Sequence, residues 1–179
     1  DFVDSVCLSF STISTGGFSP RPDSITSFSE YTQLAVTVFM FLAGTNISLL
    51  YYLLLCRPRM IWKSEEFRTY LFVIWVASVL LTLMLFGQGV DVGKSAEYSL
   101  FQVVSTISTS GYYISMPQGW MKVIPLFLFM LMFFGACSGS TGGGIKMARI
   151  MILFKYVRNQ FVIMLHPRAV APVKIDGKV

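Results

Sequence analysis

The chain has 179 residues, of which 54% are hydrophobic and 13% are charged, and its mean hydropathy is +0.65. Ordinary soluble domains carry about 25% charged residues, so this composition excludes a disordered chain and disfavours a soluble globular domain. The three cysteines, Cys7, Cys56 and Cys137, lie far apart and form no CxxC pair, which excludes a disulfide framework and a thiolate zinc site. The net charge of +5 would suit a nucleic-acid binder only if the basic residues were spread over a surface.

The chain opens with a short apolar stretch followed by a loop rich in serine, threonine and glycine. Residues 5–20 carry no charge, but so many hydroxyl groups are unsuited to lipid, because unpaired polar groups are costly in hydrocarbon. We expect residues 1–19 to dip into the membrane from outside and return. Asp4 in this dip could concentrate cations at the outer mouth, or could simply cap the helix or be solvated.

Three longer uncharged runs follow, over residues 31–56, 69–90 and 123–145. Roughly 20 helical residues cross a bilayer core of about 30 Å, so each run is long enough to span it. Three such helices buried in a soluble protein would leave almost nothing to face water, so we favour membrane spans. Within the first run, Thr45 and Asn46 could line a pore or form hydrogen bonds between helices.

The basic residues predict the orientation of these spans. Eleven of the fourteen Lys and Arg lie in residues 57–68 or after residue 145, which places both segments on the cytoplasmic side by the positive-inside rule. Two cytoplasmic segments are separated by an even number of crossings, so a fourth uncharged run, residues 98–121, should not cross as well. We therefore expect residues 95–118 to form a second dip.

The two dips repeat each other at an offset of 94 residues. Ser-Thr-Ile-Ser-Thr-Gly-Gly-Phe at residues 11–18 matches Ser-Thr-Ile-Ser-Thr-Ser-Gly-Tyr at residues 105–112. A short helix followed by a Thr-Gly loop at membrane depth is the arrangement in which ion filters offer carbonyl oxygens to a cation. Such a helix also directs its partly negative C-terminal end toward the ion. The alternative is an ordinary turn at the membrane surface, which the duplication disfavours.

The third run contains a glycine-rich segment, Gly-Ala-Cys-Ser-Gly-Ser-Thr-Gly-Gly-Gly-Ile-Lys, at residues 135–146. Each interior glycine costs a helix about 1 kcal/mol, so we predict a break, and Ile145 at the lysine position excludes a Walker phosphate loop. The segment could serve close helix packing through Gly135 and Gly139, or form a flexible loop that blocks or clears a pore. Lys146 would either snorkel to the cytoplasmic surface or help to set the closed state.

Together these motifs resemble the Trk/Ktr/HKT superfamily of potassium transporters, most closely the pore subunits of the bacterial TrkH/TrkG type. The resemblance rests on residues 11–18, 105–112 and 139–146, and residues 41–48 and 166–174 are similar to that type as well. It implies an all-α integral membrane fold of M1–P–M2 repeats around a pseudo-fourfold, potassium-channel-like pore, with re-entrant pore helices and filter loops. The chain would be an internal fragment with about one and a half of four repeats.

This repeat pattern divides the chain into four parts. Residues 1–56 would hold the pore helix, filter loop and M2 helix of one repeat, and residues 57–68 a cytoplasmic loop. Residues 69–165 would form a complete M1–P–M2 repeat with a broken M2 helix. Residues 166–179 would be a cytoplasmic tail or a linker to the next repeat.

The resemblance also assigns roles to individual residues. It implies a potassium filter at Thr15, Gly16, Gly17, Thr109, Ser110 and Gly111. It implies an intramembrane gating loop at Gly139, Ser140, Thr141, Gly142, Gly143, Gly144 and Lys146. The family filter is built mainly from backbone carbonyls around one glycine per repeat, here Gly17 and Gly111.

The resemblance therefore predicts potassium uptake across the bacterial inner (plasma) membrane by a multi-pass protein that is not an enzyme. K⁺ would be the transported ion, by channel-like flux or symport, and no organic cofactor is expected. The implied partners are membrane lipid, a second copy of the whole protein in a homodimer, and cytosolic nucleotide-binding regulatory subunits of the RCK type, but no nucleic acid. The residues alone leave open a non-transporting membrane scaffold or a component of a membrane-embedded enzyme.

Overall fold

The computed structural model describes residues 2–55, 58–115 and 123–165. Within these ranges the chain forms helices joined by loops, with one isolated bridge between Phe134 and Ile145. The helices are α1 (Phe2–Ile13), α2 (Glu30–Ala43), α3 (Ile47–Leu54), α4 (Pro58–Lys63), α5 (Glu65–Phe86), α6 (Val92–Ile107), α7 (Val123–Leu131) and α8 (Met147–Leu165). The expected tail, residues 166–179, and the expected boundary at residues 56 and 57 lie outside the described residues.

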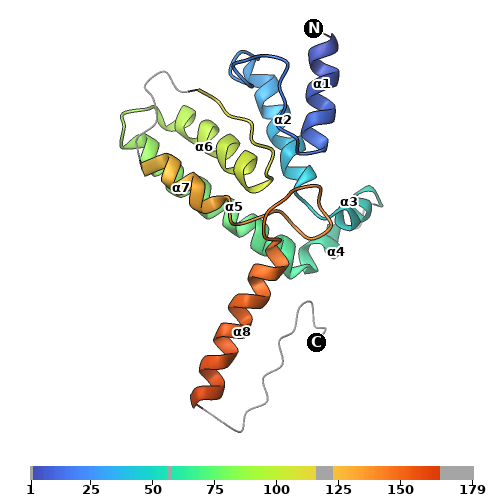
Figure 1. Ribbon diagram of the computed structural model, residues 1–179, viewed down its shortest axis with the longest axis vertical. Coiled ribbons are helices and arrows are strands. Elements are labelled where there is room, and N and C mark those ends of the chain that lie inside the picture. The colour runs from blue at the N-terminus through green and yellow to red at the C-terminus, as the bar shows by residue number, and fades with distance from the viewer. Residues whose placement is uncertain (1, 56–57, 116–122, 166–179) are drawn as a thin grey trace.

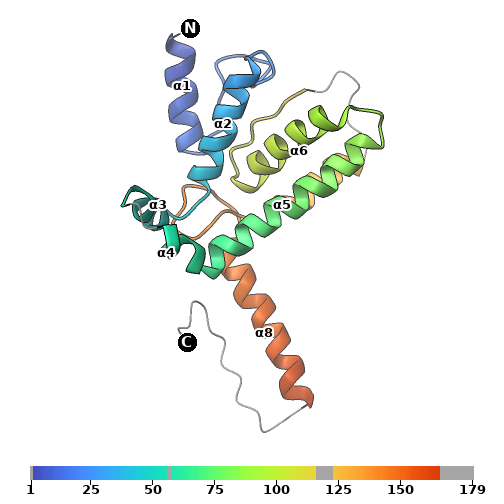
Figure 2. The same cartoon turned by 180° about the vertical axis from the view of Figure 1, so that it is seen from behind.

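Helix α6 lies at the centre of the helical packing. It contacts α5, α7 and α2, and α1 packs against α2 on the side away from α6. Figures 1 and 2 show α8 projecting away from this group of helices. The buried apolar side chains come mainly from α5, α6 and α2, and include Met40, Tyr70, Leu81, Leu85, Phe101, Val104 and Ile107.

Helix α5 confirms the expected span over residues 69–90, although it begins four residues earlier. The Ser64 side chain caps its first turn by accepting a hydrogen bond from the backbone N–H of Phe67, and Gly87 ends it. At 22 residues it is about 33 Å long, enough for a bilayer core. Among the described residues it is the one unbroken helix long and apolar enough to cross a membrane. Its outward face carries exposed large apolar side chains, such as Trp75 and Leu83.

The run over residues 31–56, expected as one span, is not one continuous helix. The chain bends by 112° between α2 and α3. Gly44 ends α2, and the Asn46 side chain caps α3 by accepting a hydrogen bond from the Ser48 N–H at 2.8 Å. The Thr45 hydroxyl donates to the Leu42 carbonyl at 2.6 Å. The Asn46 side chain therefore pairs a backbone N–H at the start of α3 that would otherwise lack a partner, and the Thr45 hydroxyl adds a further bond to a carbonyl that the backbone N–H of Thr45 also binds.

The run over residues 123–145 is broken, as the glycines predicted. Helix α7 ends at Leu131, four residues before the first glycine, Gly135, and α8 begins at Met147. Residues 132–146, which we call the glycine-rich loop, connect them. Its two ends are joined by backbone hydrogen bonds from Gly135 N to Ile145 O (2.9 Å) and from Met147 N to Ala136 O (3.1 Å). The glycine-rich loop is therefore a closed loop rather than an extended linker.

Candidate functional site

Two short loops with the same backbone conformation follow α1 and α6. We call residues 14–18 the first Thr-Gly loop and residues 108–112 the second Thr-Gly loop. Positive φ angles occur at Thr15 (52°) and Gly17 (70°) in the first, and at Thr109 (60°) and Gly111 (81°) in the second. These positions are related by the 94-residue offset of the sequence repeat. The repeat in the sequence is thus also a repeat of the backbone.

The hydrogen bonds of the two loops match as well. Gly16 N donates to Ser11 O at 2.8 Å, and Ser110 N donates to Ser105 O at 3.0 Å. A positive φ is uncommon for threonine and costs of order 1–3 kcal/mol unless the surroundings impose it. Its occurrence at Thr15 and at Thr109 indicates that the same constraint acts on both loops.

The two Thr-Gly loops touch each other. A Cβ atom built on Gly17 would lie 1.9 Å from the carbonyl oxygen of Ser110. The hydroxyl of Tyr112 also donates to the carbonyl oxygen of Phe18 at 3.3 Å. Around Gly111, in contrast, no other atom lies within 4 Å of such a Cβ. Gly17 is therefore required by close backbone approach, and Gly111 by its φ angle alone.

The glycine-rich loop lies against both Thr-Gly loops, at the centre of the molecule (Figure 1). The Thr141 hydroxyl donates to the carbonyl of Ile13 at 3.0 Å, and the Thr15 hydroxyl donates to the carbonyl of Thr141 at 3.2 Å. Gly143 N donates to the Thr109 hydroxyl at 2.7 Å. A Cβ on Gly142 would lie 2.8 Å from the carbonyl oxygen of Ser108. The loop thus contacts the C-terminal ends of α1 and α6 together.

The Lys146 side chain turns back into the glycine-rich loop. Its ammonium group donates to the carbonyl of Ser140 at 3.4 Å, to the Ser140 hydroxyl at 3.3 Å, and to the carbonyl of Gly142. The ammonium group of Lys146 is therefore held by oxygen atoms of the glycine-rich loop itself. This fixed positive charge binds backbone carbonyl oxygens that a mobile cation could also bind.

The chemistry offered by this region is that of uncharged oxygen ligands. Backbone carbonyls and threonine or serine hydroxyls converge where α1 and α6 end, and neither helix has a basic residue in its last turn. The partly negative helix ends therefore face the loops uncompensated. No group of three or more His, Cys, Asp or Glu occurs among the described residues. Such a ligand set favours a weakly held monovalent cation over a tightly bound transition metal.

Asp4 is held in an ion pair. Its carboxylate lies 3.0 Å from the guanidinium of Arg21, and that guanidinium lies over the ring of Phe28, 4.4 Å from the centroid. The side chain is therefore engaged in fixing the loop after the first Thr-Gly loop to α1.

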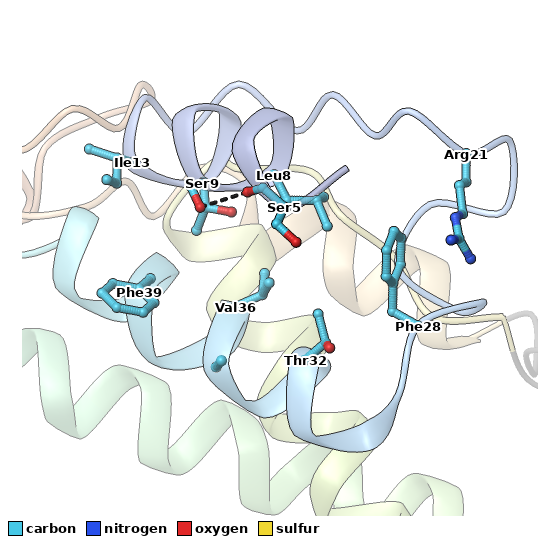
Figure 3. Close-up of a pocket in the computed structure, with 11 residues that line it drawn as sticks. Ser5, Leu8, Ser9, Ile13, Arg21, Phe28, Thr32, Val36 and Phe39 are labelled. Carbon is cyan, nitrogen blue, oxygen red and sulfur yellow. Dashed lines mark hydrogen bonds between the residues drawn. The ribbon is translucent and has the colours of Figure 1, made fainter. Parts of the chain in front are cut away.

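A cavity of about 380 Å³ lies between α1 and α2 (Figure 3) and holds none of the predicted site residues. Its walls are mostly apolar, with Leu8 and Val36 on facing helices. The Thr12 hydroxyl at its wall is buried without a hydrogen-bond partner. The candidate site is thus the contact of three loops, and it is separate from this cavity.

Two anchors of the glycine-rich loop were missed from the sequence. Cys137 N donates to the carbonyl of Gly44 at 3.0 Å, inside the α2–α3 bend. Ser138 N donates to the carboxylate of Glu66. The available signals were weak: a single Gly within an apolar run, and a pair of glutamates before a long apolar helix.

Comparison with known proteins identifies relatives along the whole chain. The family model TrkH, described as a cation transport protein, matches residues 1–179. The Trk system potassium uptake protein TrkH of Escherichia coli K12 is 34% identical over 182 aligned residues, covering 99% of this chain and 38% of the relative. The potassium uptake protein TrkG of the same strain is 31% identical, covering 98% of this chain and 37% of the relative.

A solved structure agrees with these sequence matches. The crystal structure of the potassium transporter TrkH from Vibrio parahaemolyticus superimposes with a TM-score of 0.92 at 31% sequence identity. The match covers 98% of this chain and 39% of that one. The chain therefore spans about two fifths of the length of the relatives it matches.

Proposed function

The chain belongs to the TrkH family of cation transport proteins, and on that premise we propose that it forms part of a potassium-uptake pathway across a membrane. We propose that the two Thr-Gly loops are two sides of the ion filter, with Thr15, Gly16 and Gly17 in one side. Thr109, Ser110 and Gly111 form the matching part of the other. K⁺ would be held there by backbone carbonyls in place of its water.

The observation that carries this proposal is the matched conformation of two touching loops. Both have positive φ at the threonine and at the second glycine position, and their backbones meet at Gly17 and Ser110. A symmetric filter needs equivalent loops that converge, each after a helix whose C-terminal end favours a cation. The names of the relatives, which are potassium uptake proteins, support K⁺ as the ion.

The glycine-rich loop is proposed as the gate of this pathway, through residues 139–144 and Lys146. Its Thr141 and Gly143 contact the ends of both Thr-Gly loops, so an ion leaving the filter on this side would meet the loop. The Lys146 ammonium occupies carbonyl oxygens of the same loop. Flux would require these contacts to be released.

The setting of the whole protein is proposed on the family resemblance. It would be a multi-pass protein of the bacterial inner membrane, working as a homodimer with cytosolic nucleotide-binding subunits of the RCK type. Membrane lipid would cover the exposed apolar face of α5, where Phe72 and Trp75 are more than 60% exposed. A non-transporting scaffold is the alternative function, and it makes no demand on the conformation of the Thr-Gly loops.

The test compares two glycines that differ only in location. Gly111 (φ +81°) and Gly89 (φ +83°) both have no other atom within 4 Å of an added Cβ. Each Gly→Ala substitution therefore imposes the same backbone strain, about 1–2 kcal/mol. We expect Gly111→Ala in the whole protein to lower rubidium uptake about tenfold, because the strained loop turns its carbonyls away.

Gly89→Ala is the matched control and should leave uptake unchanged. Both variants are expressed in cells that lack other potassium-uptake systems, and membrane abundance is measured for each. Equal uptake by the two variants at equal abundance would contradict the filter assignment and favour the scaffold.

A further inference from the structure

Glu66 is a buried carboxylate at the start of α5, and the proposed function gives it no role. Glu66 is 8% exposed. The same carboxylate oxygen, Oε1, accepts hydrogen bonds from Ser138 N at 2.5 Å and from Ala148 N at 3.3 Å. One side chain of α5 therefore binds the backbone at two points of another part of the chain.

These two points lie on either side of the contacts with the Thr-Gly loops. Ser138 is in the glycine-rich loop and Ala148 is in the first turn of α8. Between them lie Thr141 and Gly143, which form hydrogen bonds with Thr15 and Thr109 of the two Thr-Gly loops. The carboxylate thus fixes both ends of the segment that contacts the filter.

The two backbone donors stabilise the charged carboxylate of Glu66 at this position. Ala148 N is one of the unpaired N–H groups that begin a helix, and a negative charge at a helix N-terminus is favourable. Hydrogen bonds to a charged acceptor are also stronger than those between neutral groups. Removing the acceptor would leave two backbone donors without a partner.

The neighbouring glutamate makes a different contact. Glu65 pairs with Lys155 of α8, about two turns along that helix from Ala148. Both glutamates therefore join α5 to α8, but the bond to the glycine-rich loop belongs to Glu66. This separates a general α5–α8 attachment from a specific attachment of the loop.

We propose that Glu66 is a positioning residue that holds the glycine-rich loop against the two Thr-Gly loops. The role in conduction rests on the gating function proposed above, whereas the positioning itself does not. A displacement of the start of α5 relative to α8 would pull on Ser138 and Ala148 together.

A native cysteine reports on the position of the loop. Cys137 precedes Ser138 and is completely buried. In the whole protein with Cys137 as its single cysteine, the rate of modification by a small thiosulfonate reagent measures how often the loop leaves its place. We expect Glu66→Gln to raise this rate about tenfold, since it replaces charge-assisted hydrogen bonds by neutral ones. Glu66→Ala should raise it further.

Glu65→Gln is the matched control, and it should leave Cys137 as protected as in the unmodified protein. Rubidium flux into proteoliposomes is measured on the same samples, and Glu66→Gln should increase it. A general loss of structure would instead reduce flux and membrane abundance. If Glu66→Gln does not accumulate, Glu66→Asp keeps the charge but shortens the side chain by one methylene, and the same rise is expected.

The two readouts separate the two proposals. Cys137 that stays protected in the Glu66 variants at normal abundance would overturn the positioning role. Cys137 that becomes reactive while flux stays unchanged would support the positioning role and refute the gating function of the loop.

Discussion

Gly16 and Gly17 are adjacent in the first Thr-Gly loop, yet a methyl group would meet different surroundings at each. At Gly17 it would lie 1.9 Å from the Ser110 carbonyl oxygen and would also occupy a positive φ. At Gly16 it would lie 3.3 Å from side-chain atoms of Phe18 and Ser14, which can move. The contact at Gly17 is with a backbone oxygen, so a rotamer change of a neighbouring side chain cannot relieve it.

We therefore expect Gly17→Ala to abolish potassium-selective uptake and Gly16→Ala to reduce it less than about threefold. The measurement is rubidium uptake with sodium as competitor, in the whole protein at matched membrane abundance. Equal losses in the two variants would show that the contact between the Thr-Gly loops is unimportant.

The sequence repeat predicted which glycines belong together, since Gly17 aligns with Gly111. It could not predict that an added Cβ would meet the other loop at Gly17 but not at Gly111, because that depends on how the two repeats pack.

At the scale of the elements, the bend between α2 and α3 depends on close packing against α5. A Cβ on Gly44 would lie 2.4 Å from the hydroxyl oxygen of Tyr70. Gly44 has φ −75°, so alanine would suffer no backbone strain there and the cost would be steric. The Tyr70 ring is itself fixed by stacking on Phe41, with centroids 5.5 Å apart.

We expect Gly44→Ala to destabilise the protein by about 1–3 kcal/mol, seen as a lower thermal unfolding midpoint in detergent. Tyr70→Phe removes the clashing oxygen at the cost of a long hydrogen bond to the Phe41 carbonyl, 3.4 Å. The double variant should therefore be more stable than Gly44→Ala alone. A double variant as unstable as the sum of both single variants would refute the steric explanation.

Sequence patterns predicted the helices better than their interruptions. The helices before the two Thr-Gly loops and the break at the glycine-rich segment were predicted, because repeats and clustered glycines are strong local signals. The all-α integral membrane fold is confirmed by the match to a solved TrkH transporter. The bend at Gly44 was missed, because an uninterrupted apolar run gives no sign of a tertiary contact. The bond from Glu66 to Ser138 joins residues 72 positions apart, and no periodicity indicates it.

At the scale of the whole molecule, the helices that precede the two Thr-Gly loops, α1 and α6, differ in how much of their surface is covered. Phe10 and Ile13 on α1 are 72% and 57% exposed, whereas the residues 94 positions later, Val104 and Ile107, are 2% and 0% exposed. Helix α5 packs on α6, but no helix of the described residues packs on α1 in the equivalent way. This agrees with a chain that spans 38% of its Escherichia coli relative. Conduction should therefore be measured on the whole protein.

The glycine-rich loop contacts the ends of helices that are far from it in the sequence. The hydroxyl of Thr141 donates to the carbonyl of Ile13, at the end of α1, and lies 3.3 Å from the carbonyl of Ala43, at the end of α2. If the loop is the gate, these contacts stabilise the closed state. Thr141→Val keeps the shape of the side chain and removes the donor.

We expect Thr141→Val to raise basal rubidium flux in proteoliposomes about two- to tenfold, the effect of losing a net hydrogen-bond contribution of about 0.5–1.5 kcal/mol from the closed state. Thr82→Val is the control, because the Thr82 hydroxyl donates only to the Ser78 carbonyl within α5, at 2.8 Å. Flux through Thr141→Val that equals flux through Thr82→Val would argue that the loop serves helix packing. A higher flux confined to Thr141→Val would require the loop to leave the ends of α1 and α2 before ions pass, which packing alone does not demand.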